Sequence, residues 1–110
     1  MTDYVEIAQR GDIPAEHGLT VTVDHAAVAL FDVAGQLFAI DAACLCCGSD
    51  VGSGKLNSTH VVCSGCGWQY DLASGCVQGV AGLRLDTFEV TTDGTRVLLR
   101  NRFSSRPGRV

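Results

Sequence analysis

The chain has 110 residues, of which 46% are hydrophobic, and its formal net charge at pH 7 is −4. This length suits one domain with its own core, and the hydrophobic content excludes a disordered chain. No run of residues approaches the roughly 20 apolar positions that a membrane-spanning helix requires. Residues 1–99 hold four basic side chains against twelve acidic ones, a formal charge of −8. We therefore expect neither nucleic acid nor an anionic membrane as a partner.

The two ends of the chain differ in character. Residues 1–4 carry neither a basic flank nor an apolar run, which predicts no signal peptide and a cytoplasmic protein. Residues 100–110 hold half of the eight Lys and Arg residues and little apolar material. Because chain ends are poorly ordered unless they are anchored, residues 100–110 are predicted to be a basic, flexible tail after a domain of residues 1–99.

Short apolar stretches separated by glycine and aspartate predict an all-β domain. Strands are expected, in chain order, over Tyr4–Ile7, Leu19–Val23, Val28–Val33, Gln36–Ile40, Phe88–Thr91 and Arg96–Leu99. Ala34-Gly35 and Asp93-Gly94 predict hairpin turns. The only short helical candidate lies around Pro14-Ala15-Glu16. These elements together predict a sandwich or small barrel of short antiparallel strands.

The cysteines are clustered in a way that predicts a metal site. Five of the six lie between Cys44 and Cys66, within the Gly- and Ser-rich residues 42–82, and only Cys76 stands apart. A secreted disulfide scaffold spreads its cysteines along the chain, whereas clustered pairs in a reducing compartment are typical of metal ligation. Cys76 is expected to be a small buried hydrophobic residue.

Two loops carry the clustered sulfurs. Their sequences are Cys44-Leu45-Cys46-Cys47-Gly48 and Cys63-Ser64-Gly65-Cys66-Gly67. The glycine that ends each loop allows the backbone to fold beneath the sulfurs, and amides in such turns point at thiolates and stabilise their charge. Four thiolates from two turns can enclose a tetrahedral ion or a small iron–sulfur cluster.

The loops and their flanks resemble those of the Rieske ferredoxins. Cys44-x-Cys46, sixteen further residues and Cys63-x-x-Cys66 reproduce the loop spacing of that family, which holds a 2Fe–2S cluster with Cys-x-His and Cys-x-x-His loops. The flanks that match are Phe38-Ala39-Ile40-Asp41, Gly54-Lys55-Leu56 and the run from Gly67 to Gly75. The resemblance covers roughly residues 5–99 and implies a Rieske-like stack of antiparallel sheets with a two-loop metal-binding subdomain. It also implies a 2Fe–2S cluster whose ligands are Cys44, Cys46, Cys63 and Cys66.

The chain departs from the family at the ligands themselves. Cys46 and Cys66 stand where the family has histidine, and the histidines of this chain lie elsewhere, at His17, His25 and His60. Thiolates in place of neutral imidazoles make a cluster more negative, which predicts a potential near the plant-type value of roughly −400 mV. Because the imidazole protons are absent, the reduction potential is also predicted to depend little on pH. Other departures are Gly79-Val80-Ala81 in place of a Gly-Pro pair, and Ser49 and Gly65 at the positions of the high-potential disulfide.

The same cysteines allow a second interpretation. Cys44-x-x-Cys47, fifteen further residues and Cys63-x-x-Cys66 match the two-loop zinc pattern and resemble the single-iron arrangement of rubredoxin. Adjacent residues cannot easily both face one centre, so either Cys46 or Cys47 is the fourth ligand. A zinc- or single-iron-stabilised binding or structural module, without a cluster, is therefore an alternative.

The functional expectation is a non-catalytic electron carrier. The sequence has no nucleophile–base pair, phosphate loop or paired carboxylates, which argues against an enzyme. The resemblance implies a monomeric Rieske-type ferredoxin that serves a reductase and an oxygenase-like partner. Trp68 and Tyr70 are expected to pack beneath the second loop, with a hydrogen bond from Tyr70 to a cysteine sulfur as the alternative.

Overall fold

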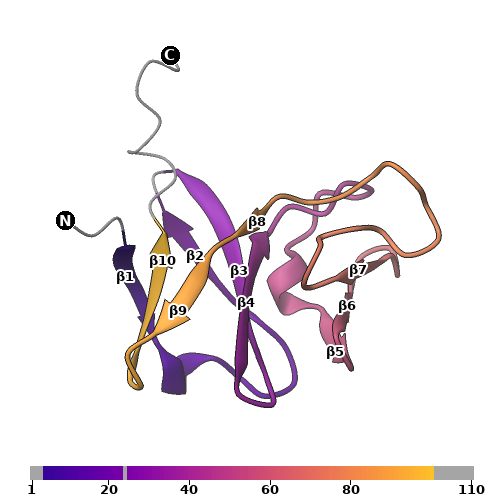
Figure 1. Cartoon of the computed structure of the whole chain (residues 1–110). Helices are drawn as coiled ribbons and strands as arrows, with labels where there is room; N and C mark the ends of the chain where they lie inside the picture. Colours follow the sequence, from indigo (N-terminus) through magenta and orange to yellow (C-terminus); the bar gives the residue numbers. More distant parts are fainter. Residues whose placement is uncertain (1–3, 24, 101–110) are drawn as a thin grey trace.

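A computed structural model describes residues 4–23 and 25–100. Three antiparallel sheets make up these residues (Figure 1). The outer sheet has the order β1 (Tyr4–Gln9), β10 (Arg96–Arg100), β9 (Val90–Thr92). The central sheet has the order β2 (Leu19–Val23), β3 (Ala26–Val33), β4 (Gln36–Asp41), β8 (Thr87–Phe88). The third sheet has the order β5 (Lys55–Asn57), β6 (His60–Val62), β7 (Gln69–Asp71). The prediction of an all-β domain is confirmed.

Strand β3 is buried on both faces, and this places the central sheet between two cores. Val28 and Leu30 belong to the core that includes Val97 and Leu99 of the outer sheet. Ala29 and Phe31 face the opposite way and belong to a second core, which extends to the metal-binding loops. Because side chains alternate along a strand, one apolar run serves both cores. Figure 1 shows the outer sheet and the third sheet on opposite sides of β3 and β4.

The second core includes the cysteine loops themselves. Cys44, Cys63 and Tyr70 are among its buried residues, with exposed fractions of 4%, 1% and 0%. The strands of the third sheet have only three residues each, so their own ladders are short. Contacts with the segment before β2 hold this sheet in place: His17 forms a bridge with Lys55, and the Leu56 amide donates to the Glu16 carbonyl at 3.0 Å.

Both predicted hairpin turns form. Ala34 and Gly35 have φ angles of 52° and 92°, the left-handed pair that a two-residue hairpin between β3 and β4 requires. At the second turn, the Asp93 carboxylate accepts the amides of Thr95 and Arg96 at 3.1 and 2.8 Å.

Two local predictions are wrong. The expected strand Phe88–Thr91 is split: Phe88 pairs with Ala39 of the central sheet, and Val90 pairs with Leu99 of the outer sheet. The chain changes sheets at the residue between them, a tertiary event that local alternation does not reveal. No helix forms around Pro14; a 3₁₀ turn at Arg10–Asp12 precedes it instead.

The predicted tail is described only at its first residue. Arg100 ends β10, and residues 101–110 lie outside the described residues. Among the residues that are described, no helix is both long and apolar enough to cross a membrane.

Candidate metal centre

The two cysteine loops lie at one end of the molecule, on the side of the third sheet. The first loop follows β4, and the second joins β6 to β7. Each loop has the same backbone turn: the Gly48 amide donates to the Cys44 carbonyl, and the Gly67 amide donates to the Cys63 carbonyl, both at 2.9 Å. Gly48 and Gly67 have φ angles of 76° and 85°, so the expected role of the glycine at the end of each loop is confirmed.

A second pair of backbone hydrogen bonds closes the same turns. The Cys44 amide donates to the Ser49 carbonyl at 3.0 Å, and the Cys63 amide donates to the Trp68 carbonyl at 2.8 Å. The two loops are therefore equivalent halves of one site, each offering its first and fourth residue.

Four cysteine sulfurs meet between the loops. The Sγ atoms of Cys44, Cys47, Cys63 and Cys66 all lie within 4.8 Å of one another. The sulfurs of Cys44 and Cys66 are 3.6 Å apart, and so are those of Cys47 and Cys63. A tetrahedral ion with metal–sulfur bonds of about 2.3 Å separates its sulfurs by about 3.8 Å. The four sulfurs are therefore placed around a volume that suits one ion.

The same spacing can be compared with that of a two-iron cluster. In such a cluster each iron holds two thiolates, and thiolates on different irons are separated by the length of the cluster. All sulfur pairs in this group, including those between the loops, stay within 4.8 Å. The spacing therefore matches a single ion more closely than a cluster. A cluster would fit only if the two loops moved apart.

The structure brings together three of the residues that both interpretations share, namely Cys44, Cys63 and Cys66. Cys47 joins them, whereas Cys46 is exposed and lies outside the group. No described histidine belongs to it. Cys76 is exposed, so its expected burial is wrong: it lies between the inward-facing Gly75 and Val77.

The sulfurs form an inner and an outer pair. Cys44 and Cys63 are buried, whereas Cys47 is exposed and Cys66 is intermediate. Burial opposes ionisation of Cys44, but hydrogen bonds from the Tyr70 hydroxyl and from the amides of Cys47 and Cys46 outweigh it and lower the pKa of Cys44 to about 6. Burial raises the pKa of Cys63, although amides of its own loop oppose the shift.

The outer sulfurs also receive hydrogen bonds. The side chain and then the amide of Ser49 lower the pKa of Cys47. The Trp68 amide favours the Cys66 thiolate, but burial and neighbouring thiols prevail and raise the pKa of Cys66. Such amide donors also stabilise the thiolates of a bound metal. In the sequence, Ser49 stands out only as the residue at one position of the high-potential disulfide; its role as a hydrogen-bond donor to Cys47 is seen first in the structure.

Tyr70 connects the site to the core. Its side chain is fully buried, and its hydroxyl oxygen lies 3.2 Å from the Cys44 sulfur. The same hydroxyl accepts the Leu45 amide at 2.9 Å, which leaves its proton for the sulfur. Tyr70 therefore both packs, as expected first, and makes the hydrogen bond that was the alternative.

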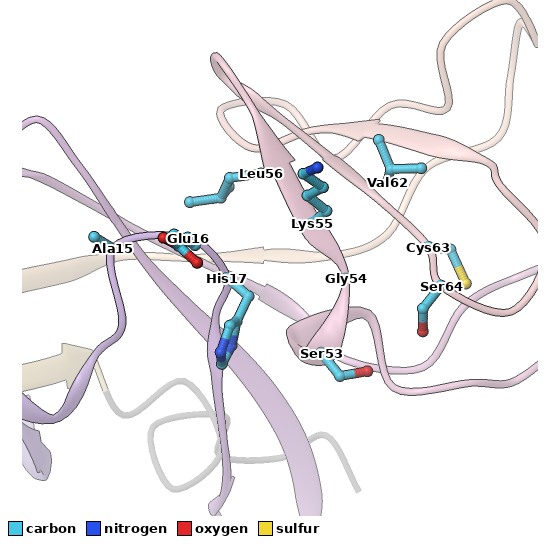
Figure 2. Close-up of a pocket in the computed structure, with 10 residues that line it drawn as sticks. All are labelled: Ala15, Glu16, His17, Ser53, Gly54, Lys55, Leu56, Val62, Cys63 and Ser64. Carbon is cyan, nitrogen blue, oxygen red and sulfur yellow. The ribbon is translucent and has the colours of Figure 1, made fainter.

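A groove runs between the segment 15–17 and the segment 53–56 and ends at Cys63 and Ser64 (Figure 2). Figure 2 shows the Lys55 amine and the His17 ring extending away from each other. The His17 ring already contacts the Gly18 carbonyl through Nδ1 at 2.9 Å. The groove therefore presents no converging set of polar groups.

The sequence around the cysteines is poor in charged residues and partly apolar. No Asp, Glu, Lys or Arg occurs in residues 42–49, 56–70 or 72–83. The large hydrophobic side chains that are exposed in the described part of the chain are Leu45, Val80 and Leu83, at 48%, 38% and 41%. All three lie in these stretches: Leu45 belongs to the first loop, and Val80 lines a hollow with Gly67 and Trp68 at the end of the second.

Solved structures with the same fold include ferredoxins and oxygenase components. The ferredoxin of Sphingomonas yanoikuyae B1 is 20% identical, with a TM-score of 0.78 over 87% of this chain and 96% of its own. The carbazole 1,9a-dioxygenase ferredoxin of Nocardioides aromaticivorans IC177 is 19% identical, with a TM-score of 0.79 over 90% and 97%. A ferredoxin solved in complex with the oxygenase of carbazole 1,9a-dioxygenase is also 19% identical, with a TM-score of 0.77 over 92% and 95%.

A search of the curated proteins finds no match. Residues 3–100, nearly the whole chain, match the family described as Rieske-like [2Fe-2S] domain. This match agrees with the stack of three antiparallel sheets and with the two cysteine loops at one end of it. The chain belongs to the Rieske-like [2Fe-2S] domain family.

Proposed function

We propose that this protein is an electron carrier whose centre is a single metal ion, iron in the active form, held by Cys44, Cys47, Cys63 and Cys66. The observation that carries the proposal is the approach of these four sulfurs to within 4.8 Å of one another. Four thiolates in tetrahedral array bind iron or zinc, and iron alone of these two cycles between oxidation states.

The hydrogen-bond donors around the sulfurs support a role in electron transfer. Reduction of a tetrathiolate iron adds negative charge, which the amide donors of both loops and the Tyr70 hydroxyl stabilise. The exposed side chains of Leu45, in the first loop, and Val80, beside Gly67 of the second, would offer a partner an apolar surface. We propose a reductase and an oxygenase-like protein as partners, a proposal supported by the ferredoxin of the same fold that was solved in complex with its oxygenase.

A second candidate is a low-potential 2Fe–2S cluster on Cys44, Cys46, Cys63 and Cys66. The observation that favours it is the match to a family described by that cluster. It requires the exposed Cys46 to turn inward, and the two loops to separate. A zinc ion on the four-sulfur group is the non-redox form of the first proposal.

Metal analysis tests these candidates. The full chain, purified anaerobically, is expected to hold one iron per chain, no acid-labile sulfide, and the electron paramagnetic resonance signal of high-spin ferric iron. Two irons with two sulfides would replace the first candidate by the second. One zinc in a colourless protein would remove the electron-transfer role and keep the ligand set.

Serine variants test the ligands. Cys47→Ser is expected to abolish retention of the ion, whereas Cys46→Ser keeps one ion per chain and an unchanged spectrum. The reverse result would assign the fourth position to Cys46. Cys76→Ser is a matched control, because Cys76 is also a free, exposed cysteine but lies outside the four-sulfur group.

A further inference from the structure

Gly65 lies in the second cysteine loop at a position where the backbone does not require glycine. The described glycines with left-handed φ angles include Gly48 and Gly67 at the ends of the two loops, but not Gly65. An alanine at position 65 therefore meets no backbone penalty. The absence of a side chain at this position needs another explanation.

The explanation is the space in front of Gly65. A Cβ atom added there would lie 2.8 Å from the Cys47 sulfur and 2.5 Å from the Ser49 hydroxyl oxygen. Cβ atoms essentially never approach other heavy atoms within 3.0 Å. Cys47 belongs to the first loop and Ser49 follows that loop directly, so Gly65 marks the point where the two loops approach each other.

The two neighbours of Gly65 differ in their freedom to move. The Ser49 hydroxyl can rotate about one bond to relieve the contact. The Cys47 sulfur cannot do so and stay in the group, because it lies 3.6 Å from the Cys63 sulfur and within 4.8 Å of the other two. Cys46 is not among the nearest neighbours of the added Cβ atom. The gap at Gly65 thus serves Cys47 and not Cys46.

We propose that Gly65 is a positioning residue that admits the Cys47 sulfur to the metal site and so decides that Cys47, rather than Cys46, is the fourth ligand. This inference rests on the ligand set of the proposed function. A side chain at position 65 would displace Cys47 outward. The site would then be left with three sulfurs and with Cys46 as the remaining nearby thiol.

The test measures Co²⁺ binding to the full chain, whose thiolate-to-cobalt absorption reports the number of sulfur ligands. Gly65→Ala is expected to lower Co²⁺ affinity by about 10- to 100-fold, as is usual for residues that orient ligands. The decisive result is the coupling between the two substitutions. Cys47→Ser should greatly lower Co²⁺ affinity in the natural chain, and the loss of affinity should be at least tenfold smaller in the Gly65→Ala chain. Gly11→Ala is the matched control, because a Cβ atom there has no neighbour within 4 Å and its φ angle is not left-handed.

A merely structural effect of alanine would not change which cysteine matters. If Gly65→Ala bound Co²⁺ like the natural chain, or if Cys47→Ser cost the same in both backgrounds, the proposal would be overturned. If Cys47→Ser had no effect in the natural background, the ligand set itself would fail, which is a separate result. Full restoration by Ser49→Ala in the Gly65→Ala chain would assign the effect to Ser49 and also overturn the role of the gap.

Alkylation keeps the test decisive if Gly65→Ala binds too little Co²⁺ for a titration. In a Cys46→Ser chain saturated with Zn²⁺, Cys47 is expected to resist iodoacetamide, and Gly65→Ala should make it react at least tenfold faster. Equal rates, with circular dichroism showing both chains folded, would contradict displacement of Cys47.

Discussion

The Tyr70 hydroxyl performs two tasks that no other described side chain shares. It accepts the Leu45 amide and donates to the Cys44 sulfur, and the ring is enclosed by the core around the loops. A donor to a ligating sulfur stabilises the more negative, reduced state of a metal centre. The hydroxyl therefore ties the stability of the first loop to the electronic properties of the site.

Tyr70→Phe is expected to leave the Leu45 amide unsatisfied and to destabilise the protein by about 1–3 kcal/mol. In the iron-loaded protein it should also lower the reduction potential, because Cys44 loses a hydrogen-bond donor. Urea unfolding and protein-film voltammetry measure the two effects. Tyr4→Phe is the control, since the Tyr4 hydroxyl bonds the exposed Glu89 and its loss should cost less than about 0.5 kcal/mol. Equal losses in the two variants would show that the Tyr70 hydroxyl has no special role.

The turn between β9 and β10 is held by the Asp93 carboxylate together with the Thr92 hydroxyl, which accepts the Gly94 amide and donates to the Arg96 carbonyl. Asp93 accepts the amides of Arg96 and Thr95 and the Arg96 side chain, which together lower the pKa of Asp93 to about 2. This turn sets the register of the outer sheet, in which Val97 pairs with Thr92. The element thus depends on a charged group.

The lowered pKa of Asp93 predicts a pH-dependent contribution to folding. Because the pKa is lower in the folded chain than the ordinary value of 3.8, the stabilisation is full above about pH 4 and is lost as the pH falls towards about 2. Asp93→Asn should therefore be less stable than the natural chain at pH 7, with a difference that narrows from pH 4 downward. Urea midpoints at pH 7, 4 and 3 measure it; a constant difference would contradict the role of the charge.

Local sequence patterns predict most strands correctly. They fail where contacts between distant segments determine the structure. The alternation in Leu19–Val23 and the Ala34-Gly35 turn identified β2 and the β3–β4 hairpin, because both are determined by neighbours in sequence. The change of sheet after Phe88 depends on which strands are already paired. The position of Cys47 in the sulfur group likewise depends on the space at Gly65, a contact between separate loops.

On the scale of the whole molecule, two cores share one central sheet but differ in the elements that enclose them. The core with Val97 and Leu99 includes the pairs β1–β10 and β2–β3, each of which is matched over five residues. The core with Cys44, Cys63 and Tyr70 is bounded by three-residue strands and by the loops that hold the sulfurs. An ion between the loops therefore stabilises one part of the molecule far more than the other.

Removal of the metal is expected to destabilise the third sheet selectively. At a metal concentration 1,000 times the dissociation constant, binding contributes about 4 kcal/mol, which the chelated protein loses. Hydrogen exchange should then show faster exchange for the amides of Val61 and Tyr70, while those of Leu30 and Leu99 keep most of their protection. Uniform acceleration across the chain would show instead that the domain unfolds as a single unit.

The four sulfurs form an inner and an outer pair, so only one side of the centre is accessible from the surface. Cys44 and Cys63 are buried in the core, whereas Cys47 is exposed and Cys66 is partly exposed. An electron would enter and leave through the outer pair, and an oxidant such as hydrogen peroxide would attack the same two atoms first. In the proposed carrier, the two sulfurs nearest a partner would therefore also be the two that an oxidant reaches first, while the buried pair stays protected.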